Sequence, residues 1–503
     1  MNKSVFFSLI IVLFSMFSPC RSMAQGKQKE ISKYARFETR FKAPLKGNPF
    51  DVKLSAVFTQ DNRQVTVYGF YAGGGQWAIR FMPDREGEWT YSTISDLPQL
   101  NGKKGKFTCV AAKTGAHGPV RVVNQTRFQY DDGTDYMPFG TTCYAWNHQG
   151  VQLEEQTLQT LATSPFNKLR MCTFPKNYAY NQNDPEHYVF VKNEDGSFDY
   201  TRFDLAYFER QEALLDRLAE LGIEADIILF HPYDRWGFCK MPREVDERYL
   251  KYYIARISSF ANVWWSMANE WDFMDAKNEQ DFDFYFQVTQ TNDPYGHLRS
   301  IHNALPLYDH TKPCVTHVSI QTPELYRTSE WLRTYKKPIV VDECQYEGDI
   351  PEGWGNLPAI EMTRRFIIGF LYGGYVGHGE TYNTGDDILW WSKGGTLRGK
   401  SPAMIAFLRA YLEKNGFSLA QFCPGSESGP NLTGIQGDKG YLFYLGILQP
   451  INLDIVMPEG RWRAEAVDVI NKKVTDMGIF EGGRFRVKMP ELSQHMAIAF
   501  YKN

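Results

Sequence analysis

Apolar and polar positions alternate in short segments over the first quarter of the chain. The segments 51–58, 64–71, 76–81 and 87–91 have a period of two and are separated by Gly, Asn and Asp residues. This period is typical of strands with one buried face, and the spacing of the segments favours an antiparallel sheet sandwich. We therefore predict an N-terminal β-sandwich domain over residues 25–125.

The pattern changes between residues 126 and 417, where apolar runs alternate with amphipathic helical stretches. Helical periodicity is clearest at 203–221, 246–260 and 361–371. Strand-like runs separated by such helices indicate a (β/α)8 TIM barrel, which typically takes about 250 residues. The eight predicted strands span 137–142, 168–173, 224–230, 263–268, 298–302, 315–320, 339–341 and 374–377.

Period-two alternation returns near the C-terminus. The segments 441–445, 462–467 and 496–501 predict a smaller β-domain over residues 418–503. The predicted fold class is therefore α/β: a TIM barrel flanked by an N-terminal β-sandwich and a small C-terminal β-domain.

The first residues have the pattern of an export signal. Lys3 precedes a thirteen-residue apolar run from Val5 to Phe17, and Ser22-Met23-Ala24 follows. Such a run is too short to span a bilayer and is typical of a signal peptide, so we expect residues 1–24 to be removed. We predict an exported protein without membrane insertion, most simply periplasmic; secretion, or a surface lipoprotein anchored at Cys20, are the alternatives.

Charge and cysteine usage narrow the function classes. The net charge is -3, whereas nucleic-acid binding selects basic patches, so we expect no nucleic-acid partner. The ten histidines form neither His-x-His nor His-Glu-x-x-His, and the cysteines form no Cys-x-x-Cys pair. We therefore expect no metal and no cofactor.

Acidic, amide and aromatic residues gather at the predicted carboxyl ends of the strands, where TIM barrels carry their function. Glu270 closes the apolar run of strand four, and Glu343 closes strand seven. The Asn-Glu pair also occurs at 193–194 and 278–279, but in polar surroundings, so the preceding apolar strand distinguishes Asn269-Glu270. Candidate substrate-binding residues at or near these ends are Arg170, Asn269, Trp146, Trp271, His231, His302, His317, Gln321, Glu380 and Tyr382.

Two carboxylates facing each other across a barrel mouth suit glycosidic cleavage. One carboxyl group protonates the leaving oxygen, and the other acts at the anomeric carbon or on a water molecule. Glu270 and Glu343 end the fourth and seventh strands, which lie across such a mouth. A separation of about 5–5.5 Å would give retention and about 6.5–9.5 Å inversion. The sequence leaves that choice open.

These motifs resemble those of a known group of enzymes. Asn-Glu at the end of strand four and Glu at the end of strand seven are similar to clan A glycoside hydrolases. The stretches 136–142, 293–302 and 342–348 resemble more closely the apiosidase-like branch of bacterial exported hydrolases. The resemblance covers essentially the whole chain after the signal segment, and it implies a retaining mechanism on a barrel with two accessory β-domains.

The resemblance also implies roles for single residues. Glu270 would be the acid/base and Glu343 the nucleophile. Asn269 would hold the sugar 2-hydroxyl, and Arg170 would orient the nucleophile.

Two further roles and one alternative follow. By the same resemblance, His231 and Tyr346 would shape the subsite for the glycone. Glu347 lies four residues beyond Glu343, so a longer seventh strand would make Glu347 the nucleophile; otherwise it is a candidate for substrate binding.

We therefore predict a glycoside hydrolase that acts on oligosaccharide or polysaccharide fragments of plant or microbial origin. A non-catalytic glycan-binding protein on a degenerate barrel is the first alternative, although both carboxylates are retained. A metal-dependent barrel hydrolase is the second, although its ligand motifs are missing from the sequence.

Overall fold

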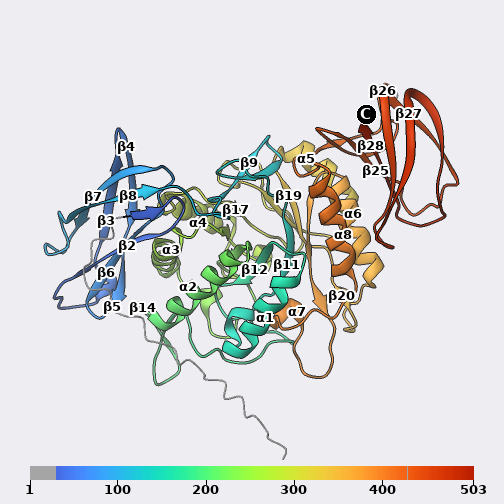
Figure 1. Ribbon diagram of the computed structural model, residues 1–503. Coiled ribbons are helices and arrows are strands. Elements are labelled where there is room, and N and C mark those ends of the chain that lie inside the picture. The colour runs from blue at the N-terminus through green and yellow to red at the C-terminus, as the bar shows by residue number, and fades with distance from the viewer. Residues whose placement is uncertain (1–29, 427–428) are drawn as a thin grey trace, which may run out of the picture.

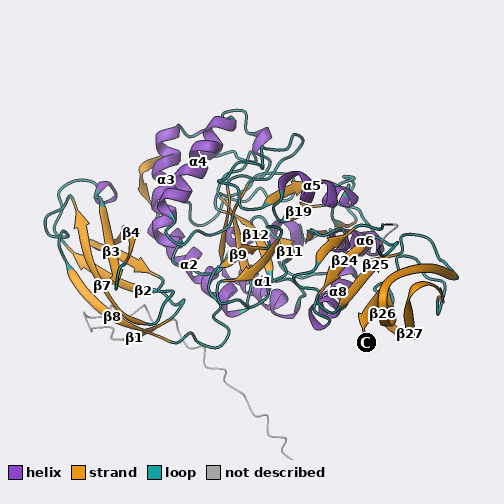
Figure 2. Ribbon diagram, turned by 90° about the horizontal axis from the view of Figure 1, so that it is seen from above, coloured by secondary structure: helices purple, strands orange, loops and turns teal. Residues whose placement is uncertain are grey.

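The computed structural model describes residues 30–426 and 429–503, so the predicted signal peptide lies outside the described residues. A barrel occupies the middle of the molecule, and two sheet domains lie on opposite sides of it (Figure 1). The view from above shows the same order, with the N-terminal strands at one end and the C-terminal strands at the other (Figure 2). The predicted fold class is confirmed.

The N-terminal domain consists of two sheets. Their inner faces enclose an aromatic core that includes Phe58, Trp77 and Trp89. Alternation explains this core, because strand 54–60 buries every second side chain. One sheet has the order β1 (Glu30–Ser32), β8 (Lys104–Val110), β7 (Gly87–Ser95), β3 (Leu54–Gln60), β4 (Arg63–Tyr68), and the other β2 (Phe37–Lys42), β6 (Gln76–Phe81), β5 (Phe70–Gly73). Within the first sheet, β1 pairs with β8 in parallel.

Eight parallel strands form the barrel, and each overlaps one of the predicted strands. In chain order they are β11 (Phe139–Thr142), β12 (Lys168–Cys172), β15 (Glu224–Ile228), β16 (Val263–Ser266), β17 (Arg299–Ser300), β18 (Val318–Gln321), β19 (Ile339–Glu343) and β21 (Tyr375–His378). Ladder pairing runs β17-β16-β15-β12-β11-β21-β19-β18. The remaining gap between β17 and β18 is bridged by a hydrogen bond from Thr316 N to Arg299 O at 2.9 Å. The barrel is therefore nearly closed.

Helices cover the outside of the barrel. The predicted helices are confirmed as α2 (Leu205–Glu220), α3 (Arg243–Ile257) and α6 (Ala359–Leu371). The others are α1 (Val151–Thr163), α4 (Glu279–Asn292), α5 (Thr328–Tyr335), α7 (Trp390–Lys393) and α8 (Ser401–Lys414). Periodicity places their apolar faces inward: α2, for example, buries Leu214, Leu215 and Leu218.

The C-terminal domain is one antiparallel sheet. Its order is β23 (Gln421–Cys423), β24 (Gly434–Gly437), β25 (Gly440–Tyr444), β28 (Ala497–Lys502), β26 (Asn452–Asp468), β27 (Lys473–Lys488). Three short pairs complete the strands: β9 (Val120–Val123) with β10 (Arg127–Tyr130), β13 (Phe190–Lys192) with β14 (Phe198–Phe203), and β20 (Glu347–Gly348) with β22 (Glu380–Thr381). Among the described helices, none has the length and apolar character to cross a membrane.

Buried polar contacts attach the flanking domains to the barrel helices. Arg80 of the N-terminal domain donates to Glu212 on α2 at 2.8 Å and to the Arg256 carbonyl on α3 at 2.9 Å. On the other side, the Tyr411 hydroxyl of α8 donates to Glu465 of β26 at 3.0 Å. These contacts lie on the helices outside the barrel. The N-terminal domain also reaches the β13–β14 hairpin, where Asn48 Nδ2 donates to the Thr201 carbonyl at 2.9 Å.

Candidate active site

Glu270 is presented by a sharp turn at the end of β16. The apolar strand keeps its backbone in the barrel ladder, and the Asn269 N–H then donates to the Phe230 carbonyl of the neighbouring strand end at 3.0 Å. Glu270 itself has φ 50° and ψ 57°, a left-handed conformation that is uncommon for a residue with a side chain. Such strain gathers at functional sites, where the surrounding structure enforces it. Asn269 Nδ2 donates to Glu270 Oε2 at 3.0 Å and fixes the carboxylate.

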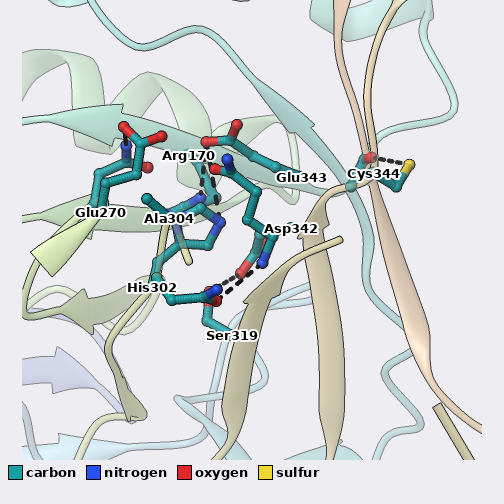
Figure 3. Close-up of polar contacts among 12 residues, drawn as sticks. Arg170, Glu270, His302, Ala304, Ser319, Asp342, Glu343 and Cys344 are labelled. Atoms are coloured by element: carbon teal, nitrogen blue, oxygen red, sulfur yellow. Dashed lines mark hydrogen bonds and ion pairs between the residues drawn. The ribbon is translucent and has the colours of Figure 1, made fainter. Parts of the chain in front are cut away.

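Glu343 is the last residue of β19 and faces Glu270 across the mouth (Figure 3). The Tyr144 hydroxyl, from the loop after β11, donates to Glu343 Oε1 and lies 3.0 Å from Asn269 Oδ1. One tyrosine therefore links the segments that carry the two acids. Both carboxyl groups are nearly enclosed, with exposed fractions of 6% for Glu270 and 5% for Glu343.

Gln321 connects the two carboxylates directly. A register shift between Ile320 and Gln321 in the β18–β19 pairing puts Gln321 beside Glu343, as bulges near active sites commonly do. With its NH2 group turned towards the acids, the Gln321 amide donates to Glu270 Oε1 at 3.3 Å and to Glu343 Oε2 at 3.2 Å. Because one nitrogen lies within these distances of both oxygens, the oxygens are at most 6.5 Å apart.

A layer of buried charges lies beneath the acids. Lys168 Nζ lies 2.5 Å from Asp226 and 2.8 Å from Asp342. Arg170 lies between Asp226, at 3.5 Å, and Glu343 Oε1, at 3.9 Å. Burial opposes ionisation of Asp342, but Lys168 and then Arg170 outweigh it and hold the pKa of Asp342 below its usual range. The family resemblance implied that Arg170 lies next to the second acid, and the structure places the two 3.9 Å apart.

Burial raises the pKa of Glu343 to about 7, and the nearby Tyr346 hydroxyl and Trp354 indole partly offset this rise. Neither of these two groups reaches hydrogen-bonding geometry. Glu343 thus titrates near neutral pH, with Arg170 close enough to favour its ionised form.

Two predicted histidines also lie in the mouth, and both are neutral at pH 7. His302 Nε2 is 4.0 Å from Glu343 Oε1, and burial, followed by Arg170, holds the pKa of His302 well below its usual value. His231 Nε2 contacts the Phe174 carbonyl at 3.0 Å, and burial lowers the pKa of His231 to about 4. Neutral imidazoles can donate or accept a hydrogen bond from a sugar hydroxyl.

Three predicted residues are engaged elsewhere. Glu347 Oε1 accepts from the Tyr382 hydroxyl at 3.1 Å and from Lys400 N at 2.9 Å, and its other oxygen accepts from Ser401 N at 3.1 Å. Glu380 accepts from the Arg398 and Gly399 N–H groups at 2.5 and 2.7 Å. These contacts hold the start of α8, where a helix favours negative charge. Glu347 and Glu380 therefore anchor the start of α8, and the Tyr382 hydroxyl is bonded to Glu347. These contacts correct the predicted place of the two glutamates in the substrate site and leave Glu343 opposite Glu270.

Glu347 and Glu380 also belong to a group of possible metal ligands. Glu347, Glu380 and His378 place ligand atoms within 4.8 Å of one another, the one such group among the described residues. The backbone N–H groups at the start of α8 already bind both carboxylates, and they supply the positive charge that a metal ion would bring. A helix anchor explains this group without a metal.

Three other predicted residues, Trp146, His317 and Trp271, lie in different surroundings. Trp146 is fully buried in the main barrel core, so it has no face free for a sugar, and its prediction as a stacking residue is corrected. His317 precedes β18 and packs against Trp264 and Phe128, at the end of the barrel away from the acids. Its predicted place in the substrate site is therefore wrong, because the sixth strand was predicted to begin a few residues too early. Trp271 follows Glu270; its backbone N–H donates to the His302 carbonyl at 3.1 Å, and its ring packs edge-on against Tyr308.

Two residues of the mouth were not singled out from the sequence, although Tyr144 lies in the stretch 142–146 at the end of the first predicted strand. Tyr144 lies two residues beyond β11, and Lys176 lies four residues beyond β12. A single tyrosine or lysine in a loop carries no pattern, and only the position after a barrel strand could have marked them. Tyr346, which the resemblance did imply, packs on Trp391 near Glu343, and Gly379 beneath it has no room for a Cβ atom.

Comparisons with known proteins agree with this geometry. A family model described as an apiosidase-like catalytic domain matches residues 123–399, while models of two domains of unknown function, DUF5060 and DUF5605, match residues 30–96 and 431–500. No curated protein matches the chain. A solved structure from Bacteroides vulgatus ATCC 8482, described provisionally as a glycoside hydrolase, is 39% identical, with a TM-score of 0.89 over 95% of this chain and 100% of its own.

A more distant structure supports the fold alone. A glycoside hydrolase of family 5, also from Bacteroides vulgatus ATCC 8482, is 12% identical with a TM-score of 0.61, covering 77% of this chain and 94% of its own. With the family model matching more than half of the chain and the acids meeting at the barrel mouth, the protein belongs to the apiosidase-like family and has a glycoside hydrolase fold.

Proposed function

We propose that the protein is an exported glycosidase that cleaves oligosaccharides or polysaccharide fragments with retention of configuration. The observation that carries the proposal is the Gln321 amide, which lies within 3.3 Å of both Glu270 and Glu343. The resulting limit of 6.5 Å between their oxygens reaches only the lower edge of the range for inversion, about 6.5–9.5 Å, and includes the range for retention, about 5–5.5 Å.

The surroundings of the two acids support different roles. Glu343 receives the Tyr144 hydroxyl and has Arg170 at 3.9 Å, and both favour a carboxylate anion that can attack the anomeric carbon. Glu270 is held by two amides, from Asn269 and Gln321, rather than by a cation at contact distance. An amide can bind either protonation state, as an acid/base residue requires.

The chemistry then has two steps. Glu270 gives its proton to the leaving oxygen while Glu343 forms a covalent bond to the anomeric carbon and the glycosidic bond breaks. Glu270, now ionised, removes a proton from water; the water oxygen attacks the same carbon, and Glu343 leaves as a carboxylate. Asn269, which is hydrogen-bonded to Tyr144 and Glu270, lies where it can bind a hydroxyl of the glycone.

The test is hydrolysis of a panel of oligosaccharides and activated aryl glycosides by purified protein, with the product anomer read by NMR before mutarotation. Glu270→Gln and Glu343→Gln should each lower turnover by more than about 100-fold, since positioned acid–base catalysis contributes about 10²–10⁴-fold. Glu194→Gln is the matched control, because it is also preceded by Asn but lies in an exposed turn. Inverted product would refute retention, and full activity of either site variant would refute the assignment of the pair.

A chemical rescue separates the two roles. With an activated aryl glycoside, azide should restore turnover of Glu270→Ala and give a glycosyl azide of retained configuration. With Glu343→Ala, azide should attack in place of the nucleophile and give the inverted product. The opposite pairing would exchange the roles of the two acids. Binding of sugars without hydrolysis by the unaltered protein would instead favour a glycan-binding function.

A further inference from the structure

Lys176 places a buried ammonium group among aromatic rings. The residue is 2% exposed and lies on the loop after β12. Its Nζ is 3.6 Å from the ring centre of Tyr144, 4.3 Å from that of Tyr233, 4.8 Å from that of Tyr178 and 5.9 Å from that of Trp391. A cation within about 6 Å of a ring centre is attracted by the negative face of the ring. The shortest of these distances puts the cation against the face of Tyr144.

The backbone around Lys176 is held by two hydrogen bonds. The N–H of the next residue, Asn177, donates to the Tyr233 carbonyl on the loop after β15 at 2.8 Å. The buried side chain of Asn181 donates to the Lys176 carbonyl at 2.6 Å. These bonds fix the loop, so the position of the ammonium group is set by the backbone and the surrounding rings.

Lys176 differs from the other buried lysines of the described chain. Lys168 is paired with two aspartates, and Lys277 with Asp246 at 2.5 Å. Buried charges are normally paired in this way, because the loss of hydration is costly. Lys176 has no carboxylate within ion-pair distance among the described residues, so the ring faces are its nearest partners. Burial lowers the pKa of Lys176 to about 8, which leaves the group mostly charged at pH 7.

We propose that Lys176 is a positioning residue of the hydrolysis, which acts through Tyr144 to strengthen the hydrogen bond that this tyrosine donates to the nucleophile Glu343. The inference rests on the proposed glycosidase function. The ring against Nζ of Lys176 is the one whose hydroxyl donates to Glu343 and lies 3.0 Å from Asn269 Oδ1. One aromatic ring therefore separates the cation from the carboxylate that would attack the anomeric carbon.

The effect of Lys176 on Tyr144 has two physical parts. A positive charge against the ring face draws electron density out of the phenol, so its O–H becomes a stronger donor, and in a buried site such polarisation passes along a chain of polar contacts. The contact also fixes the plane of the ring and hence the direction of its hydroxyl. A stronger and better aligned donor stabilises the ionised form of Glu343, which is the form that can attack.

The first test is the pH dependence of hydrolysis of uncharged activated aryl glycosides. Lys176→Met should lower kcat about 10-fold with little change in KM, since a desolvated cation over a ring contributes on this scale, and it should move the acidic limb of kcat/KM to higher pH. Lys176→Arg, which keeps the charge, should recover part of the loss. In a Tyr144→Phe background, Lys176→Met should have little further effect, because the hydroxyl through which it acts is absent. Lys192→Met is the matched control, because Lys192 lies 4.9 Å from the Tyr188 ring but is exposed.

Unfolding measurements test the same contact without turnover. Burial raises the pKa of Glu343 to about 7, so wild type should lose stability relative to Glu343→Gln as the pH rises, and this loss should level off above that value. Between Lys176→Met and Lys176→Met/Glu343→Gln the loss should level off at a higher pH, because the ionised form of Glu343 is then less stabilised. Urea unfolding from pH 5 to pH 9 measures both differences.

The outcomes separate the inference from the proposed function. Lys176→Met should unfold at the same temperature as wild type or higher, because it removes an unpaired buried charge. Lys176→Gln, also uncharged, repeats each comparison, so a folding defect of one variant does not decide the result. An acidic limb and a stability difference unchanged by either variant would overturn the inference, as would a rise in KM at unchanged kcat or a full additional loss in the Tyr144→Phe background. A shifted stability difference without hydrolysis of any substrate would count against the proposed function alone.

Discussion

Replacing Lys168 with methionine removes the ammonium group that bridges two buried aspartates beneath the catalytic pair. Lys168 Nζ lies 2.5 Å from Asp226 and 2.8 Å from Asp342, and all three side chains are at most 1% exposed. Loss of one partner from a buried ion pair typically costs about 3–5 kcal/mol, because the other charge remains buried. Both aspartates lose Lys168, but Arg170, 3.5 Å from Asp226, still compensates part of the charge of Asp226. We therefore expect the free energy of unfolding to fall by about 3–5 kcal/mol in total.

The loss of stability in Lys168→Met should depend on pH. In wild type the pKa of Asp342 is lowered, so its stabilising contribution is present above the pKa of the unfolded chain and is lost as the pH falls through the lower folded value. Without Lys168 the main influence left on Asp342 is burial, which raises its pKa, so the variant becomes less stable as the pH rises. The difference between wild type and variant should therefore be largest at pH 8 and smaller at pH 5.

Chemical unfolding followed by tryptophan fluorescence at pH 5 and pH 8 measures both quantities. At 2–4 °C per kcal/mol for a domain of this size, thermal unfolding should also begin about 6–20 °C lower. Lys192→Met is the control for loss of a lysine charge, because the Lys192 side chain is exposed at the end of β13. Adding Asp342→Asn to Lys168→Met should restore part of the loss. A difference below about 1 kcal/mol, or one that does not depend on pH, would refute the electrostatic reasoning.

Three further predictions concern the site and its support. Tyr144→Phe should keep the fold and lose about 10- to 100-fold in kcat/KM, because it removes a hydrogen bond to the Glu343 carboxylate; kinetics and thermal unfolding of the variant check this. The acidic limb of kcat/KM should lie near pH 7, since Glu343 must be ionised to attack, and Tyr346→Phe should move that limb to higher pH because Tyr346 lowers the pKa of Glu343. A limb near pH 4 would contradict the raised pKa. Gly399→Ala should destabilise the protein by about 1–3 kcal/mol, measured by unfolding, because its Cβ would lie 2.6 Å from a carboxylate oxygen of Glu380; unchanged stability would show that the start of α8 moves freely.

The fold was predictable from local patterns. Period-two segments marked both flanking sheets, and eight apolar runs between helical stretches marked the barrel, since backbone geometry dictates these periods. The fifth strand, predicted over 298–302, is the shortest of the barrel, β17 at Arg299–Ser300. The start of β18 was predicted three residues too early. The strand-like run 315–320 begins before the first paired residue, Val318, and its sequence does not mark where pairing starts.

Part of the site was also predictable. Glu270 and Glu343 each end an apolar strand, and a barrel brings the ends of its strands to one face. The sequence thus determined the fold class and the two acids that meet at the mouth.

Only the tertiary structure decided what each neighbouring side chain contacts. Glu347 and Glu343 are four residues apart, and the contacts with the start of α8, more than fifty residues later, distinguish them. The aromatic rings around Lys176 come from distant loops, and a shift in strand register places Gln321 beside Glu343. Burial, pairing and pKa depend on contacts between segments far apart in the chain, and a local pattern carries no record of them.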